Sequence, residues 1–232
     1  MASYLVTGSS RGLGLALVAR LATFPKTEVG TIIVTARQDN SAQLKSIAMW
    51  KRVWQLQGKG LDYLVNNAGV SDWSPTGLEG MDNLNETFNV NATATHIVSR
   101  AFLPLLRKGE KKTVLNISST VGSIAMADAF PRHTTPAYKI SKAALNMLTV
   151  KYAQQYVDDG FTFLAISPGV MWLRTDLGSD LADLPVEIGA EKVLDIIQKT
   201  TPDQNGKFLD IYVPRSEMQG GTYQYDGKEI PW

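Results

Sequence analysis

Two side chains that can act together on a proton lie four residues apart, Tyr138 and Lys142, in a segment with helical apolar periodicity. Residues at i and i+4 of a helix project from one face, so the ammonium can lie beneath the phenol or a shared ligand. A free phenol, with a pKa of about 10, is a poor proton donor at neutral pH. A nearby cation favours the phenolate and lowers this pKa. The pair therefore indicates acid–base chemistry, although it also occurs by chance in many helices.

A glycine-rich turn near the N-terminus predicts a phosphate-binding site. The turn Thr7-Gly8-Ser9-Ser10-Arg11-Gly12-Leu13-Gly14 follows a short apolar run. A helix N-terminus offers unpaired N–H groups, and glycine lets a ligand approach the backbone closely. The spacing is not the G-x-G-x-x-G dinucleotide fingerprint, so a tight strand-to-helix turn is an equal alternative on this pattern alone. The Tyr/Lys pair and two further turns, Asn66-Asn67-Ala68-Gly69 and Pro168-Gly169, favour the binding site.

The elements that must position these residues alternate between short β-rich runs and helical patterns. Such alternation predicts a parallel, doubly wound sheet with helices on both faces. The expected strands are residues 4–6, 31–35, 61–65, 114–117, 161–166 and 208–213, and the expected helices are residues 12–23, 82–107, 137–156 and 187–199. We find no repeat or linker in the 232 residues, so residues 1–232 are expected to form one domain.

The composition excludes several classes of function. A net charge of +1 gives no electrostatic case for a nucleic-acid partner or an anionic membrane. The absence of cysteine excludes disulfides and thiol chemistry. The sequence shows neither a signal-peptide pattern nor a run of about 18 apolar residues, so a cytoplasmic protein with no membrane span is expected. Two isolated histidines, His96 and His133, are too few for a metal site.

Taken together, these motifs resemble the short-chain dehydrogenase/reductase family in its single-domain form. The resemblance is carried by Thr7-Gly8-x3-Gly12-x-Gly14, Asn66-Asn67-Ala68-Gly69, Val90-Asn91, Asn116-Ile117-Ser118-Ser119, Tyr138-x3-Lys142 and Pro168-Gly169, in the family's order. It implies a three-layer Rossmann-type fold. It also implies an NADP(H)-dependent oxidoreductase that interconverts a carbonyl compound (a ketone or an aldehyde) and an alcohol. Residues 206–210 and 226–232 resemble the small carbonyl reductase subgroup that includes the sniffer and C-factor proteins.

The resemblance implies four catalytic residues, and the chemistry of their side chains agrees. Tyr138 is the candidate general acid or base, and Lys142 would lower its pKa and hydrogen-bond the nicotinamide ribose. Ser119, chosen over Ser118 by the family pattern, would donate to the substrate oxygen. Asn91 would hold a water behind Lys142 that relays the proton. Taken singly, each is as easily a core or surface residue, and only their joint occurrence favours catalysis.

Cofactor-binding residues are expected at both ends of the site. They are Thr7, Gly8, Ser10, Arg11, Gly12, Leu13, Gly14, Arg37, Asn67, Ala68, Gly69, Tyr138, Lys142, Pro168, Gly169, Val170 and Thr175. In doubly wound folds the end of the second strand holds an acid for the ribose of NAD, or a base for the 2′-phosphate of NADP. Arg37 stands there and Arg11 can add charge, so NADP(H) is favoured, while Asp39 keeps NAD open.

The segment after the second strand departs from the family pattern. Only 23 residues, Gln38 to Gly60, stand where the family fits a helix, a strand and another helix. A strand at 52–57 leaves too few residues for a parallel crossover, whereas one helix over 41–57 spans about 25 Å. We therefore expect the edge third-strand region to be shortened, with loss of an acidic residue that the family uses near the adenine. Val170 and Met171 also look inserted after Pro168-Gly169.

The substrate and partners are predicted only by class. An aromatic-rich rim is expected to favour a hydrophobic or aromatic ketone or aldehyde, and its candidates are Trp73, Phe130, Met171 and Trp172. The two long helices are candidates for the family's common homodimer or homotetramer interface. The alternative function is a cofactor-binding, non-catalytic or interaction protein on the same fold.

Overall fold

The computed structural model describes residues 1–36, 60–130, 134–169, 173, 175, 182, 184–218 and 223–232. Within these residues six parallel strands form one sheet in the order β2-β1-β3-β4-β5-β6. The strands are β1 (Ala2–Val6), β2 (Val29–Val34), β3 (Tyr63–Asn66), β4 (Thr113–Ile117), β5 (Thr162–Ser167) and β6 (Phe208–Asp210). The helices are α1 (Gly12–Ala22), α3 (Leu84–Phe88), α4 (Ala94–Leu106), α5 (Pro136–Gln155) and α6 (Val186–Lys199). Short turns of 3₁₀-helix are η3 (Thr120–Gly122), η4 (Ala127–Ala129), η5 (Pro202–Gln204) and η6 (Arg215–Glu217).

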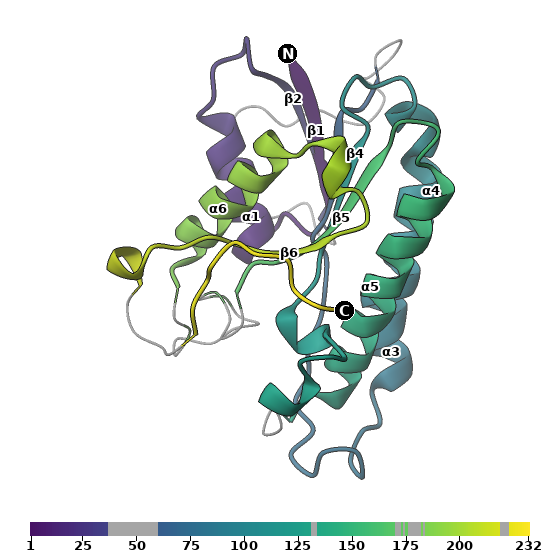
Figure 1. Cartoon of the computed structure of the whole chain (residues 1–232), viewed down its shortest axis with the longest axis vertical. Helices are drawn as coiled ribbons and strands as arrows, with labels where there is room; N and C mark the ends of the chain where they lie inside the picture. The colour runs from purple at the N-terminus through teal and green to yellow at the C-terminus, as the bar shows by residue number, and fades with distance from the viewer. Residues whose placement is uncertain are drawn as a thin grey trace.

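The sheet is covered on both faces, which confirms the expected three-layer doubly wound fold. Helices α1 and α6 lie on one face and α3, α4 and α5 on the other (Figure 1). The chain leaves β1 to form β2 on one side and returns to form β3 on the other. Ligands of doubly wound sheets bind at such a reversal, outside the carboxyl ends of the strands. The topology therefore places the glycine turn after β1 at this position.

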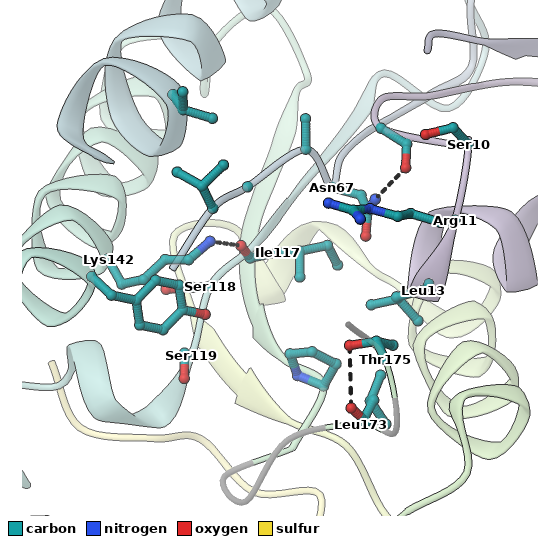
Figure 2. Close-up of a pocket in the computed structure, with 18 of the residues that line it drawn as sticks. Ser10, Arg11, Leu13, Asn67, Ile117, Ser118, Ser119, Lys142, Leu173 and Thr175 are labelled. Carbon is teal, nitrogen blue, oxygen red and sulfur yellow. Dashed lines mark hydrogen bonds between the residues drawn. The ribbon is translucent and has the colours of Figure 1, made fainter. Parts of the chain in front are cut away.

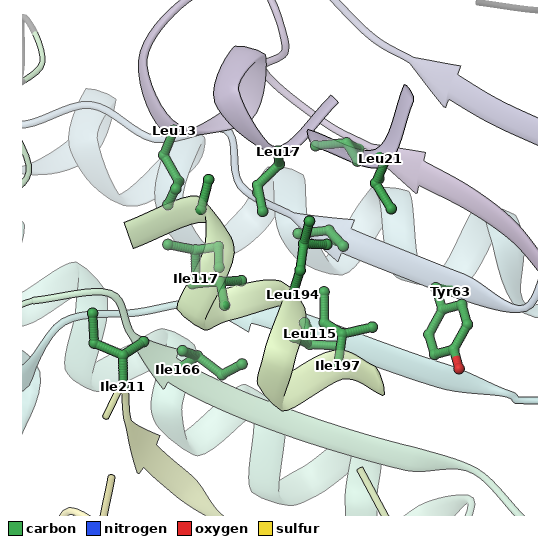
Figure 3. Packing of buried hydrophobic residues seen from close by; sticks show 14 of the residues in the cluster. Leu13, Leu17, Leu21, Tyr63, Leu115, Ile117, Ile166, Leu194, Ile197 and Ile211 are labelled. Carbon is green, nitrogen blue, oxygen red and sulfur yellow. The ribbon is translucent and has the colours of Figure 1, made fainter. Parts of the chain in front are cut away.

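One face of the sheet is packed by leucine and isoleucine side chains. Leu13, Leu17 and Leu21 recur every four residues along α1, so they share the face that turns inward. Figure 3 shows them against Leu194 and Ile197 of α6 and against side chains of the central strands. All five are buried, and burying each such side chain contributes on the order of 1.5–3 kcal/mol. This layer fixes α1, and with it the glycine turn, on the sheet.

The long helix expected over 82–107 forms, but one stretch of it is wound differently. Between α3 and α4 the chain makes a π-helical turn, η2 (Asn89–Thr93). Such turns insert a residue into the α-helical repeat and are frequent at functional sites. The turn carries Asn91, which is fully buried. The expected helix over 137–156 is α5, and the expected helix over 187–199 is α6.

The last strand is shorter than its sequence pattern predicts. Residues 208–213 were expected to be extended in the sheet, yet β6 ends at Asp210. Beyond it, Tyr212 forms an antiparallel bridge with Asp226, and within β6 Leu209 forms one with Glu229. The C-terminal residues therefore pair with the chain around β6, and the apolar pattern of 208–213 reflects this contact as well as the sheet.

The expected shortening of the third-strand region falls in residues 38–60, and all of them except Gly60 lie outside the described residues. Of the described helices, none is long and apolar enough to span a membrane.

Candidate active site

The carboxyl ends of the strands surround a cavity of about 440 Å³. Its walls come from the turns after β1, β2, β3, β4 and β5 and from α5. The described residues that line it are Gly8, Ser10, Arg11, Gly12, Leu13, Thr35, Ala36, Asn67, Ala68, Gly69, Val70, Val90, Ile117, Ser118, Ser119, Tyr138, Lys142, Pro168, Gly169, Leu173 and Thr175. Figure 2 shows Ser10, Arg11 and Leu13 on one side of this space, with Lys142, Ser118 and Ser119 on the other. The two motifs singled out in the sequence thus share one site.

Glycine is required in the turn after β1 for two different reasons. Gly8 and Gly12 have φ angles of 67° and 54°, a region that other residues rarely adopt. At Gly14 the limit is space, because a Cβ atom would lie 2.4 Å from the carbonyl oxygen of Gly8. The turn can therefore close tightly and deliver the N-terminus of α1, which begins at Gly12, to the cavity. The free N–H groups and the positive dipole end of the α1 N-terminus suit a phosphate.

Thr7 and Asn67 join the turn after β1 to the turn after β3. The Thr7 hydroxyl accepts hydrogen bonds from the backbone N–H groups of Asn67 and Ala68, both at 3.0 Å. The Asn67 amide donates to the carbonyl oxygen of Thr7 at 2.9 Å. Thr7 and Gly14 were expected to bind the cofactor, but neither lines the cavity in the described residues. Their contacts shape the turn, and their expected role in cofactor binding stays a prediction.

Tyr138 and Lys142 lie on the first turns of α5 and face the cavity from one side, as their spacing predicts. Both are buried, with exposed fractions of 6% and 4%. The Lys142 Nζ atom lies 5.4 Å from the centroid of the Tyr138 ring and donates a 2.7 Å hydrogen bond to the carbonyl oxygen of Ile117. The ammonium is thus held between α5 and the end of β4.

The electrostatics of the pair differ from the expectation. Burial raises the pKa of Tyr138 to about 12, and a hydrogen-bonding contact with the Ser119 hydroxyl opposes this rise more weakly. Burial also lowers the pKa of Lys142 to about 8. The expected lowering of the phenol pKa is therefore not found, because burial, which disfavours the charged form of each group, dominates both shifts. Near neutral pH the phenol is protonated and the amine is charged.

The two serines after β4 have different surroundings. Ser118 donates a 2.5 Å hydrogen bond to Oδ1 of Asn146. Ser119 is 2% exposed, and its Oγ has no partner within hydrogen-bond geometry among the described residues, so its contact with the phenol is a loose one. Both line the cavity, but only Ser119 keeps a hydroxyl uncommitted. A buried polar atom without a partner is costly, which makes Ser119 Oγ a natural place for a ligand oxygen.

Asn91 lies behind the cavity wall and not in it. Its amide nitrogen donates to the Val70 carbonyl oxygen and to Ser141 Oγ, both at 2.9 Å. Its amide oxygen accepts the Val70 N–H at 2.9 Å. Both amide protons are used by protein groups, because the π-helical turn points the side chain between the turn after β3 and α5. The expected role of holding a water stays a prediction.

The cofactor half of the site is described only in part. Thr175 lies over the glycine turn, since a Cβ at Gly12 would meet its methyl group at 3.3 Å. Arg37, Asp39 and Val170 lie outside the described residues. The expected contact of Arg37 with the 2′-phosphate and the apparent insertion at Val170 therefore fall outside them as well. Among the described residues, no three His, Cys, Asp or Glu side chains gather to hold a metal ion. His96 packs between helices, with its Nδ1 2.9 Å from the hydroxyl of Tyr152.

Several lining residues were not among the expected site residues. They are Thr35, Ala36, Val70, Val90, Ile117, Ser118 and Leu173, although Val90, Ile117 and Ser118 stand within the quoted motifs. Thr35 and Ala36 directly follow a buried strand, so the rule that ligands bind at strand ends could have found them. Leu173 has no such signal. Of the expected rim residues, Trp73 is 63% exposed, and neither it nor Phe130 is among the described residues that line the cavity. Met171 and Trp172 lie outside the described residues.

Comparison with known proteins agrees with this arrangement. A family model described as short chain dehydrogenase matches residues 27–183. The C-signal protein of Myxococcus xanthus is 34% identical over 173 residues, which cover 74% of this chain and 93% of that protein.

Solved structures extend the likeness to the whole chain. The NADPH-bound carbonyl reductase from chicken fatty liver has a TM-score of 0.83 and 26% sequence identity, over 100% of this chain and 94% of that one. The carbonyl reductase Sniffer of D. melanogaster has the same TM-score and identity, over 100% of both chains. The likeness therefore includes the strands, the turns and both helical layers that surround the cavity.

Proposed function

The chain belongs to the short chain dehydrogenase family, and on that basis we propose that it is an NADP(H)-dependent oxidoreductase that interconverts a carbonyl compound and an alcohol. The observation that carries the proposal is the buried phenol of Tyr138 in one cavity with the uncommitted hydroxyl of Ser119 and the glycine turn. The similar carbonyl reductase from chicken fatty liver binds NADPH, and the similar Sniffer protein is a carbonyl reductase.

The residues present fit a nicotinamide dinucleotide. The cradle that Gly8, Gly12 and Gly14 leave at the start of α1 suits the phosphates, and Arg11 adds positive charge beside it. Lys142 and the Pro168-Gly169 turn line the other half, where a nicotinamide riboside would be held. When bound, NADPH supplies the hydride, and the protein supplies position, charge and a proton.

Tyr138 is the proposed proton donor. As hydride reaches the carbonyl carbon, the oxygen gains negative charge and needs a proton. A phenol with a pKa of about 12 stays protonated at neutral pH, and it still gives its proton readily to an alkoxide, which is the stronger base. Ser119 would donate a hydrogen bond to the same oxygen, a contact worth most in a site shielded from water. Lys142 would hold its charge beneath the phenol and stabilise the phenolate left behind.

Asn91 has a supporting role in this scheme. It joins Val70, at the cavity wall, to Ser141, which lies one residue before Lys142. We place Asn91 as a positioning residue, because its amide is already hydrogen-bonded to these groups. The substrate class is proposed to be hydrophobic or aromatic ketones and aldehydes, because apolar side chains such as Leu13, Val90 and Leu173 line the cavity.

A binding and turnover experiment tests the proposal. NADPH fluorescence should change on addition of the protein, and NADPH should be oxidised with members of a panel of aromatic aldehydes and diketones. Gly14→Ala should abolish binding, because the new methyl group collides with the Gly8 carbonyl. Binding without turnover across the panel would instead favour a non-catalytic protein, an alternative kept open by a relative whose name, C-signal, does not specify an oxidoreductase.

Cofactor preference is tested separately at Arg37, the sequence-based candidate for the 2′-phosphate. Arg37→Asp should weaken NADPH binding more than NADH binding, because the guanidinium can bind a phosphate with two hydrogen bonds. A preference that does not change would place the discriminating charge elsewhere, with Arg11 the next candidate.

A further inference from the structure

The C-terminal segment, defined here as residues 223–232, contacts the active-site wall from behind. It runs antiparallel to the chain around β6 and is held there by four backbone hydrogen bonds of 2.7–3.2 Å. In each bond a backbone N–H donates to a carbonyl oxygen: Asp210 to Lys228, Val213 to Tyr225, Gly227 to Ile211 and Ile230 to Phe208. The segment is therefore part of the folded domain. Its motif was noted in the sequence, but the proposed reaction gives it no role.

The far end of this segment is fixed to the loop that follows Ser119. Ser123 donates a 2.5 Å hydrogen bond to the carbonyl oxygen of Pro231, and the Ala125 N–H donates to that of Trp232 at 2.9 Å. The Trp232 ring stacks on Phe208 at 5.4 Å between centroids. The segment thus links β6 to the chain after β4, which carries Ser119.

The first residue of the segment, Tyr223, is connected to the chain after β4 through a row of polar side chains. The Tyr223 hydroxyl makes loose hydrogen-bonding contacts with the Asp210 carboxyl and with Thr120, since Asp210 Oδ2 has no partner within hydrogen-bond geometry among the described residues. Thr120 in turn binds Ser167 Oγ twice, through its hydroxyl at 2.8 Å and its N–H at 3.1 Å. Thr120 directly follows Ser119, and Ser167 directly precedes Pro168 of the cavity wall. A row of four side chains therefore connects the ends of β6, β4 and β5.

We propose that Asp210 and Tyr223 are positioning residues that hold the Ser119 turn in place for proton transfer, through Thr120 and Ser167. The proposal rests on the proposed function, because it concerns the efficiency of that reaction. Neither residue lines the cavity in the described part of the chain, so both would act through Thr120 and not on the substrate.

The chemistry of Asp210 sets it apart from a purely structural residue. It is 2% exposed, and its Oδ1 accepts the Ile211 N–H at 3.0 Å. Among the described residues no cation forms an ion pair with it; the groups that face it are Tyr223 and Asp226, and Lys228 is paired with Asp226 at 2.9 Å. Its partner in the β5 register is Ser167, which does not titrate in this range. An apolar side chain would fill this place at lower cost, since a buried carboxylate without a cation is unfavourable.

The charge of Asp210 decides how the row is hydrogen-bonded. Burial, and secondarily the charge of Asp226, raises the pKa of Asp210 to about 7, while the contacts with Tyr223 and Ile211 oppose the rise. Above this pH the carboxylate accepts the Tyr223 proton in a charge-assisted bond, the stronger kind, and the Tyr223 oxygen can accept the Thr120 hydroxyl, so the row stays connected. Below it, the carboxylic acid can donate to Tyr223, whose proton then turns toward Thr120. The turn should be held more firmly when Asp210 is charged.

The test compares pH profiles of kcat/KM for NADPH-dependent carbonyl reduction between pH 5.5 and 9. The wild type should show a three- to tenfold rise through pH 7. Asp210→Asn should remove this step, and Tyr223→Phe should flatten it and lower kcat/KM three- to tenfold at pH 8, with NADPH binding unchanged in both variants. Tyr212→Phe is the matched control, an exposed tyrosine paired with the same segment, and should follow the wild type. Profiles of Asp210→Asn and Tyr223→Phe that run parallel to the wild type would overturn the proposal.

A second measurement does not depend on turnover. The Thr120 and Gly122 amides donate to Ser167 Oγ and to the Ser119 carbonyl oxygen, so their hydrogen exchange reports how firmly the turn is held. Exchange should be three- to tenfold faster in Tyr223→Phe than in Tyr212→Phe. Equal rates in these two variants would also overturn the proposal. If no carbonyl compound is reduced but exchange changes as expected, the proposed function fails while the positioning contact stands.

Discussion

Both faces of the sheet carry apolar clusters, but the faces differ at the strand ends nearest the cavity. On the α1 and α6 face the cluster is apolar, with residues such as Leu17, Val193 and Leu194 almost fully buried. On the α4 and α5 face, the strand ends nearest the cavity carry buried amides. Asn66 donates to Asn116 at 2.8 Å and to Ser99 of α4 at 3.0 Å. Asn116 in turn donates to Thr149 of α5 at 2.8 Å, so these amides bridge β3 and β4 to both helices.

The difference separates folding from positioning. Apolar packing is non-directional and tolerates small shifts, so it suits the face whose task is to hold α1 and its glycine turn. Hydrogen bonds between buried amides have fixed partners and directions, so they suit the face that sets α5 against β4, where Lys142 and Ser119 must meet. We therefore expect changes on the first face to affect stability alone. Changes on the second should affect both stability and turnover.

Tyr138→Phe should give the largest effect, and it removes only one oxygen atom. Without a proton donor, kcat/KM should fall by about 10³-fold or more, equivalent to about 4 kcal/mol of transition-state stabilisation. NADPH binding and thermal stability should stay close to wild type, since the ring still fills its site. Steady-state kinetics and NADPH fluorescence measure the two properties. Tyr156→Phe, at the far end of the same helix, is the matched control. Wild-type turnover in Tyr138→Phe would refute the role of its hydroxyl.

Leu17→Ala tests the apolar face. The side chain is fully buried, so its loss should lower the free energy of unfolding by about 3 kcal/mol, within the usual range for a leucine-to-alanine cavity. The kcat/KM of the remaining folded protein should not change, because the cavity forms away from the strand ends. Urea titration and kinetics well below the unfolding midpoint provide the measurements. Ile97→Ala, at a half-exposed position, serves as the control. A parallel loss of turnover would show that this face also positions the site.

The sequence predicts features that depend on local patterns, and it does not predict contacts between distant parts of the chain. The strands, the helices and the sharing of one cavity by Tyr138 and the glycine turn follow from periodicity and spacing, which are local. The family motifs added Asn91 and Ser119. The links from Asp210 and Tyr223 to Thr120 could not be predicted, since they join residues about 90 or more positions apart. The direction of the Tyr138 pKa shift was also missed, because burial depends on the whole fold. Neither kind of information is present in a local pattern.

Asn116→Ala tests the amide-rich face. The substitution removes one of the two partners of the Asn66 amide and the donor to the Thr149 hydroxyl, which should lower the free energy of unfolding by about 2 kcal/mol. Because β4 then loses one of its links to α5, kcat/KM should also fall, by roughly tenfold, about 1.4 kcal/mol. Thr149→Val, which removes the hydroxyl that accepts from Asn116, should give a smaller change of the same kind. If Asn116→Ala loses stability but keeps wild-type kcat/KM, the separation between the two faces fails.

The smallest expected effect is a decline of activity at high pH, and it also belongs to the amide-rich face. Burial lowers the pKa of Lys142 to about 8, so its charge is present below this pH and is lost above it. Tyr138, with a pKa of about 12, stays protonated throughout. For carbonyl reduction, kcat/KM, which reports the free enzyme, should therefore fall above pH 8 by a few-fold over one pH unit. Lys142→Arg, charged at every pH, should be less active but should lack this decline. Lys139→Arg, on the same helix turn, should retain the decline, and a decline that persists unchanged in Lys142→Arg would assign it to another group.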